Sequence, residues 1–140
     1  MILQTASFGP FETNVYIVGC PKTKNACIID APAGCLPYVL ASVKKHDLTV
    51  THLLLTHAHI DHIVDAGKLK KAFPVPLFIH KLDAPGLLHP RGKEMDVAFQ
   101  SAEGMEADHL LEDGDFISVG NFSFQVLFTP RAQPWVYLFL

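Results

Sequence analysis

The chain lacks the long apolar runs and basic runs that mark membrane spans and nucleic-acid binding. No apolar stretch among its 140 residues approaches the roughly 20 residues that a membrane-spanning helix needs. Lys and Arg form no run longer than the pairs Lys44-Lys45 and Lys70-Lys71, and the formal net charge is -3. We therefore expect neither a membrane partner nor a nucleic-acid partner.

Cysteine is scarce, and the three that are present show no metal-type pairing. Cys20, Cys27 and Cys35 are odd in number, a usage typical of buried, reduced thiols in a cytosolic protein. The N-terminal residues Met1 to Thr5 contain neither the basic region nor the apolar region of a secretion signal. The expected location is cytoplasmic.

The chain does contain enough apolar sequence for a folded core. Hydrophobic residues make up 49% of the sequence and the mean hydropathy is +0.25. These values are typical of a globular protein and exclude a disordered one. A chain of this length is about one domain, so we expect residues 1–140 to form a single domain.

Short apolar runs, separated by turn residues, predict strands with helices between them. Strands are expected at residues 2–8, 14–18, 26–30, 53–55 and 77–80, the first two joined by a Gly9-Pro10 turn. Helical spacing of apolar residues predicts helices over residues 36–43 and from 61 to just before 74. Residues 81–108, rich in Pro, Gly and charge, are long enough to be a flap over a site.

The C-terminal part is predicted to be rich in strands. Turn residues occur at 113–115 and 120–121, and Phe122, Phe124, Val126 and Phe128 alternate toward one face. Strands alternating with helices, followed by this β-rich end, predict a mixed α/β (α+β) layered fold.

One short segment, Thr56 to His62, concentrates residues that bind metals. It follows the apolar run of residues 51–55, which includes the strand expected at 53–55. His57 and His59 are two positions apart, so on an extended backbone both point the same way. Asp61 and His62 fall where a helix begins, and Asp suits the first turn of a helix.

Imidazole and carboxylate groups are donors suited to zinc, iron or manganese. The segment therefore predicts a metal site made by His57, His59, Asp61 and His62. The alternative is a polar surface loop whose histidines are only solvated. The concentration of metal ligands at this spacing favours the metal site.

The same segment resembles the HxHxDH signature of the metallo-β-lactamase superfamily. Three other segments are similar to parts of that family. Asn14 to Val18 resembles its N-x-Y strand, and Ile28 to Asp30 resembles its strand ending in Asp. Leu111 to Asp115 resembles the hairpin that precedes its next metal ligand. Within the superfamily the chain looks most like the glyoxalase II-like (hydroxyacylglutathione hydrolase-like) enzymes. The resemblance runs from about Met1 to Pro130. It implies the N-terminal part of an αββα sandwich that carries two zinc ions, or sometimes iron, in a cleft.

The resemblance also implies roles for the four residues. His57 and His59 would hold the first metal, and Asp61 and His62 the second. A hydroxide between the metals, oriented by Asp61 as the catalytic residue, would attack a thioester or a similar small acyl substrate. An iron-dependent enzyme of the persulfide dioxygenase kind shares the signature and is a further alternative.

The chain departs from the family pattern after Pro130. The family has a His shortly after a Thr-Pro pair, and here Ala132 stands in its place. A bridging Asp and a last His, which the family also needs, do not appear before Leu140. The domain is therefore expected to be incomplete, which makes a catalytically impaired fragment with residual metal binding the main alternative to an active hydrolase.

A frameshift after Pro130 is one explanation of this departure. Trp135 followed by Val136, read one base later, must give Gly. With particular synonymous codons, the preceding residues give the rest of a Gly-His-Ser-Pro-Gly-Ser string. A divergent or shortened natural end is the other explanation. In either case the exposed half-sandwich face and the apolar tail predict poor solubility, or a homo-oligomer that covers the face.

Overall fold

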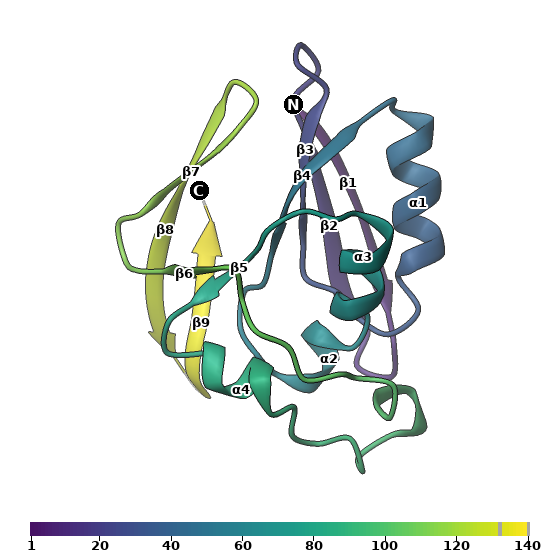
Figure 1. Cartoon of the computed structure of the whole chain (residues 1–140), viewed down its shortest axis with the longest axis vertical. Coiled ribbons are helices and arrows are strands. Elements are labelled where there is room, and N and C mark those ends of the chain that lie inside the picture. The colour runs from purple at the N-terminus through teal and green to yellow at the C-terminus, as the bar shows by residue number, and fades with distance from the viewer. Residues whose placement is uncertain (132, 140) are drawn as a thin grey trace.

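The chain forms two β-sheets, with helices against one of them (Figure 1). The computed structural model describes the backbone of residues 1–131 and 133–139 and the side chains of residues 1–129. A larger sheet has the strand order β1-β2-β3-β4-β5-β6, and a smaller one has the order β7-β8-β9. In Figure 1, α1 and α3 lie on one side of the larger sheet and the smaller sheet lies on the other. This is the mixed α/β layered fold that the sequence predicts.

The first five elements build most of the larger sheet. They are β1 (Ile2–Phe8), β2 (Thr13–Gly19), β3 (Asn25–Ile29), α1 (Leu36–Lys45) and β4 (Thr49–Leu54). β1 and β3 each pair antiparallel with β2, whereas β3 and β4 are parallel. The parallel pair requires a crossover, which α1 supplies. The strands and the helix predicted for this part of the chain are confirmed, although β4 begins four residues earlier than expected.

The helix predicted from residue 61 onward is divided in two. The structure has α2 (Ile60–Ile63) and α3 (Ala66–Ala72), separated by a turn at Val64 and Asp65. The prediction of one continuous helix was therefore wrong. Asp65 accounts for the break, because its backbone N–H donates to the Ala31 carbonyl at 2.9 Å and its Oδ2 accepts from the Gly34 N–H at 2.9 Å. These contacts turn the chain toward the loop after β3.

The remaining elements complete both sheets. They are β5 (Leu77–His80), α4 (Ala84–Leu88), the 3-10 turn η1 (Val97–Phe99), β6 (His109–Leu111), β7 (Phe116–Val119), β8 (Phe122–Arg131) and β9 (Gln133–Phe139). β5 and β6 extend the larger sheet in parallel, and β8 pairs antiparallel with β7 and β9. The side chains from Pro130 onward, Ala132 and Trp135 included, lie outside the described residues. Predictions about the side chains of the tail therefore stay predictions.

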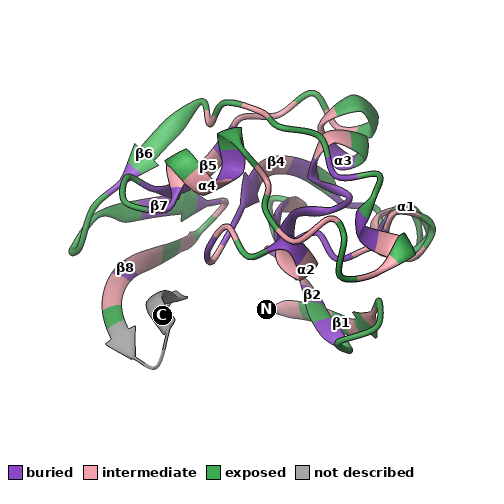
Figure 2. Cartoon of the chain, turned by 90° about the horizontal axis from the view of Figure 1, so that it is seen from below, coloured by how far each residue is buried: buried purple, intermediate pink, exposed green. Residues whose placement is uncertain are grey.

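The central strands of the larger sheet are buried on both faces and form the middle layer. Ile28 of β3 and Leu53 of β4 belong to an apolar cluster on the helix side. Their neighbours Cys27 and Leu54 belong to a second cluster, which reaches the smaller sheet. Side chains alternate along a strand, so β3 and β4 each contribute to both clusters. Figure 2 shows the buried residues along β4 and β5, between the two outer layers.

The segment predicted as a flap is anchored to the core. Leu87 of α4 and Phe99 of η1 are buried in the helix-side cluster. Phe11, in the turn between β1 and β2, packs edge-on against Phe99 with ring centroids 5.4 Å apart. Between these anchors, Met95 and Val97 are 62% and 77% exposed. The segment therefore has fixed ends and an exposed apolar middle.

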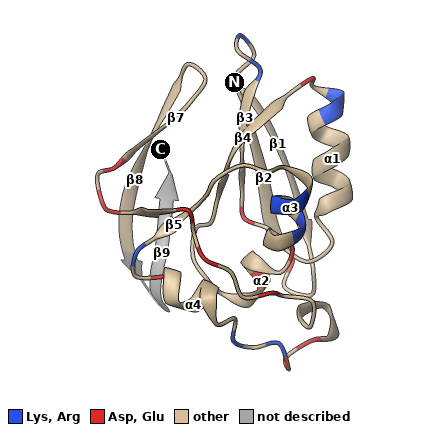
Figure 3. Cartoon of the chain, in the orientation of Figure 1, with Lys and Arg blue, Asp and Glu red and all other residues tan. Residues whose placement is uncertain are grey.

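Charged residues are spread over the outside of the fold. Basic residues gather on α3 and at the C-terminal end of α1 (Figure 3), where they complement the negative end of each helix dipole. Within the part of the chain that the structure describes, no helix combines the length and the apolarity needed to span a bilayer.

Candidate metal centre

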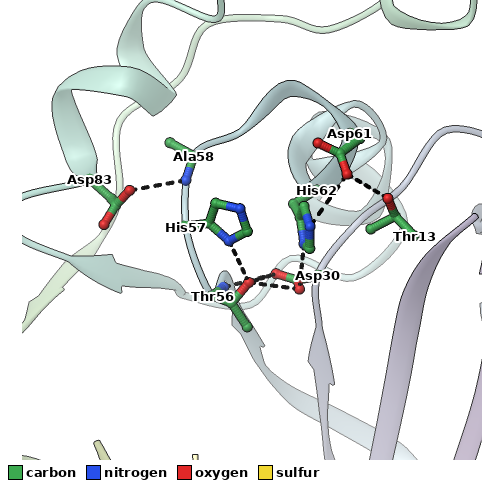
Figure 4. A network of polar contacts seen from close by, with 8 residues as sticks. All are labelled: Thr13, Asp30, Thr56, His57, Ala58, Asp61, His62 and Asp83. Carbon is green, nitrogen blue, oxygen red and sulfur yellow. Dashed lines mark hydrogen bonds and ion pairs between the residues drawn. The ribbon is translucent and has the colours of Figure 1, made fainter. Parts of the chain in front are cut away.

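The candidate site forms where parallel strands of the larger sheet end. β3 ends just before Asp30, and β4 ends just before the loop that carries His57 and His59 into α2. Polar groups at the carboxyl ends of parallel strands meet at one edge of the sheet. Figure 4 shows the side chains of His57, Asp61 and His62 turned toward a shared space above Asp30.

The three imidazole rings of the motif lie together. The ring centroid of His57 is 4.5 Å from that of His59 and 4.1 Å from that of His62. His57 is 6% exposed, whereas His59 is exposed. Burial, together with the nearby His62, lowers the pKa of His57 to about 4. His57 is therefore neutral at physiological pH, the form in which imidazole binds a metal.

Asp30 orients His62. Its Oδ2 lies 2.8 Å from His62 Nδ1, and its carboxylate also accepts from Thr56, from the backbone N–H at 2.8 Å and from the hydroxyl at 2.8 and 3.0 Å. Burial disfavours a charged His62, but the hydrogen bond and charge of Asp30, with the charge of Asp61, outweigh it and raise the His62 pKa. Because a carboxylate only accepts, Nδ1 carries the proton and Nε2 is left for a metal.

Thr56 sets the tautomer of His57 in the same way. Its hydroxyl lies 3.0 Å from His57 Nδ1, and its single proton is already directed at Asp30. We therefore assign the proton between the two side chains to His57 Nδ1, which donates to the hydroxyl. Nε2 of His57 then keeps its free lone pair. One buried carboxylate thus orients two of the four predicted ligands.

Asp61 is held by a residue from β2, which runs antiparallel to β3 and begins at the edge of the sheet where β3 ends. Its Oδ2 accepts from the Thr13 hydroxyl at 2.5 Å and lies 3.4 Å from His62 Nε2. Thr13 is the first residue of β2 and is 7% exposed. Sequence reasoning missed Thr13 because a hydroxyl 48 positions away leaves no local signal.

Asp83 supports the loop between the first two histidines. The Ala58 N–H donates to Asp83 Oδ1 at 3.3 Å (Figure 4). Asp83 is 7% exposed, and its Oδ2 has no hydrogen-bond partner among the described residues. Burial raises the pKa of this carboxyl to about 6. Asp83 thus binds the backbone of the residue between His57 and His59.

The donors present fit a divalent metal ion but form only part of a site. His57 and His62 offer imidazole nitrogens and Asp61 offers a carboxylate, the donor set of zinc and iron sites. Among the side chains of residues 1–129, however, no three His, Cys, Asp or Glu side chains form a group that could hold an ion alone. Further donors are needed to close the coordination.

Two other features lie apart from this cluster. The buried ring of His80 stacks on Phe128 with centroids 5.6 Å apart, and its Nδ1 accepts from the Leu82 N–H, which is a structural role. A cavity of about 590 Å³ lies against α3 and is lined by residues that include Lys68, Lys71 and Glu103. None of the four predicted ligands lines it.

Comparison with known protein families gives a match over most of the chain. Residues 8–134 match the model of the metallo-beta-lactamase superfamily. An uncharacterised protein of Aquifex aeolicus is 36% identical over 138 residues, covering 96% of this chain and 62% of that protein. "Probable metallo-hydrolase YqgX" of Bacillus subtilis is 29% identical over 136 residues, covering 90% and 59%. A hydroxyacylglutathione hydrolase of Aliivibrio fischeri is 29% identical over 131 residues, covering 92% and 43%.

Solved structures show the same likeness. The BLEG-1 B3 metallo-β-lactamase gives a TM-score of 0.84 at 29% identity, covering 99% of this chain and 66% of that one. The protein TTHA1623 in a di-iron-bound form gives 0.77 at 28% identity, covering 98% and 66%. The chain therefore spans less than two thirds of the length of each of these proteins.

Proposed function

This chain belongs to the metallo-β-lactamase superfamily, and we propose that its His-rich loop is one wall of a metal site for hydrolysis of a small thioester or related acyl substrate. The observation that carries the proposal is the network around Asp30. It engages the Nδ1 atoms of both His57 and His62, whose ring centroids lie 4.1 Å apart, and Asp61 Oδ2 lies 3.4 Å from His62 Nε2. A loop of solvated histidines has no need of a buried carboxylate that sets two tautomers.

The proposed role of each residue follows from the metal-binding atoms that its side chain offers. His57 and His59 would hold one ion, and Asp61 and His62 would hold a second. A bound zinc or iron ion lowers the pKa of water toward neutrality and polarises the substrate carbonyl. Asp30 keeps His62 oriented, and Thr56 does the same for His57. Asp61, which has an oxygen with no hydrogen bond among the described residues, would accept a hydrogen bond from the attacking water and orient it.

The thioester class rests on the likeness to hydroxyacylglutathione hydrolase, of which the chain covers 43%. The acyl group and the thiol that carries it are left open. Iron is the alternative metal, because one similar structure is a di-iron-bound form. An iron-dependent dioxygenase acting on a persulfide is therefore the second candidate enzyme, and it is distinguished by iron as the only metal bound after expression.

A catalytically impaired fragment is the candidate from a different class. Residues 1–129 hold no complete group of three donors, and Ala132 occupies the place of the next expected His. On this proposal the chain binds one ion weakly and turns over little or no thioester. Sequencing the coding DNA across Pro130 and Arg131 tests the frameshift, since codons that cannot yield the shifted string exclude it.

Metal titration combined with a thioester assay separates these candidates. Zinc binding with hydrolysis well above background supports the hydrolase, and binding without hydrolysis supports the fragment. His57→Ala should abolish the binding in both cases, whereas His89→Ala, which removes an exposed histidine outside the motif, should leave it unchanged. If the wild-type chain binds no zinc, iron or manganese at micromolar concentrations, the proposed metal site is wrong.

A further inference from the structure

We propose that Thr13 is a positioning residue that holds the Asp61 carboxylate in the orientation a metal ion needs. The inference rests on the proposed function, because it assigns Asp61 to the metal site. Thr13 lies outside the His-rich loop and reaches it through one hydrogen bond, from its hydroxyl to Asp61 Oδ2 at 2.5 Å (Figure 4). This is the contact that ties the β1–β2 hairpin to the candidate ligands.

Thr13 is itself held rigidly. It pairs with Phe8 at the end of the β1–β2 ladder. The turn between the strands is closed by a hydrogen bond from the Glu12 N–H to the Gly9 carbonyl at 3.2 Å. The side chain is 7% exposed, and a β-branched residue has few χ1 rotamers open to it. The hydroxyl is therefore presented from a fixed point.

Only one of the two Asp61 carboxylate oxygens accepts a hydrogen bond among the described residues. Oδ2 is taken by Thr13 and lies 3.4 Å from His62 Nε2, while Oδ1 makes no hydrogen bond among the described residues. The side chain of Asp61 is 17% exposed, so burial alone does not prevent its rotation. A single donor at Oδ2 is enough to choose one rotamer and to leave Oδ1 for a metal or a metal-bound water. Residues that hydrogen-bond to a metal ligand without touching the metal affect metal affinity.

Thr13→Val tests the hydroxyl without removing side-chain volume. Valine is branched like threonine and favours strands, so the hairpin should form as before. Thr13→Ser keeps the donor. Thr51→Val is the matched control, because Thr51 lies in β4 of the same sheet and its hydroxyl donates to the Ala26 carbonyl at 3.1 Å, away from the His-rich loop.

Zinc affinity, measured by competition with a chromogenic chelator, is the first readout. Thr13→Val should weaken zinc binding about tenfold, at the low end of the effect of such partners. Thr13→Ser and Thr51→Val should stay within about twofold of the wild type. Wild-type affinity in Thr13→Val, or an equal loss in Thr13→Ser, would overturn the proposal.

The second readout does not depend on metal. In the metal-free protein, NMR couplings that report the Asp61 χ1 angle should show one rotamer in the wild type and averaging in Thr13→Val. A single, unchanged Asp61 rotamer in Thr13→Val would overturn the positioning role. If the wild type binds no zinc, the proposed metal site fails, whereas averaging of Asp61 in Thr13→Val still supports the role of Thr13.

Discussion

Asp30 is the residue on which most of the candidate site depends. It is 2% exposed, adopts a left-handed backbone conformation with φ of +63°, and receives donors from both Thr56 and His62. Asp is one of the few side chains that tolerate this backbone region. The position therefore combines a strained backbone with a buried carboxylate, which is a pattern that marks functional sites.

Replacing Asp30 by Ala should destabilise the protein and loosen the site together. The change leaves the Thr56 donors and His62 Nδ1 without an acceptor, and a buried unsatisfied group costs about 1–3 kcal/mol. We expect a loss of about 3 kcal/mol in the free energy of unfolding, measured in urea. Asp47→Ala is the control, since Asp47 also has a positive φ, of +53°, but is exposed. An equal loss in both variants would show that backbone strain, and not the network, explains the effect.

Because of Asp83, the free energy of unfolding of the metal-free protein should fall as the pH rises. Burial raises its folded pKa to about 6 from an unfolded value of 3.8, so the folded state holds the proton more tightly than the unfolded state does. The resulting stability is fully present below the unfolded pKa and is lost as the pH rises through about 6. At about 1.4 kcal/mol per pKa unit, the loss between pH 4 and pH 7 is about 2 kcal/mol.

Asp83→Asn should remove this pH dependence, because the amide stays neutral and its oxygen can still accept from the Ala58 N–H. Urea unfolding at pH 4, 5, 6 and 7 in EDTA measures the effect. Asp47→Asn removes the same charge from an exposed position and should leave the slope unchanged. A wild-type slope in Asp83→Asn would mean that another group titrates in this range.

The break between α2 and α3 is the clearest case of tertiary contacts overriding a local helical pattern. Asp65 is 1% exposed, and it accepts both from the Gly34 N–H and from Lys68 Nζ, the latter at 2.6 Å. Side chains that bond to backbone outside their own helix compete with helix continuation. The turn also places the start of α2 against the sheet edge.

Asp65→Ala should therefore cost more than the loss of its ion pair with Lys68 alone. The Gly34 N–H loses its acceptor, for which we expect about 1–2 kcal/mol of destabilisation. Lys68→Ala removes only the ion pair, in which the lysine side chain is 46% exposed and the Asp65 side chain is buried, and should cost less, because Asp65 keeps its hydrogen bond from the Gly34 N–H. Thermal unfolding of both variants measures the difference, and equal costs would contradict the role given to the Gly34 contact.

The sequence predicts those elements whose signals are local. Alternation of apolar residues placed β1, β2, β3 and β5, and the spacing of His57 and His59 located the candidate site. What it could not predict are contacts between distant residues: Thr13 with Asp61, Asp30 with His62, and Asp83 with Ala58. These depend on which strand ends share an edge, and that is decided by packing of the whole sheet.

At the scale of the molecule, apolar residues lie exposed on two consecutive strands, β6 at the end of the larger sheet and β7 at the end of the smaller one. Phe116 in β7 is 67% exposed, and Leu110 in β6, one turn before it, is 58% exposed. If these side chains form one contiguous apolar patch, the patch is of the kind that binds another protein or causes association. The expected homo-oligomer would cover this region with a second copy of the chain.

Light scattering measures this association directly. For a chain of 15.4 kDa, we expect a mass of at least twice that value at a concentration of about 50 μM, in the range where modest apolar interfaces associate. Phe116→Ser and Leu110→Ser should each shift the mass toward the monomer, because each removes apolar area from the contact. Val97→Ser is the control, since Val97 is 77% exposed but lies in η1, outside the two sheets.

A monodisperse 15.4 kDa species in the wild type would exclude the oligomer. Equal shifts in all three variants would show that association is driven by exposed apolar side chains in general and not by β6 and β7.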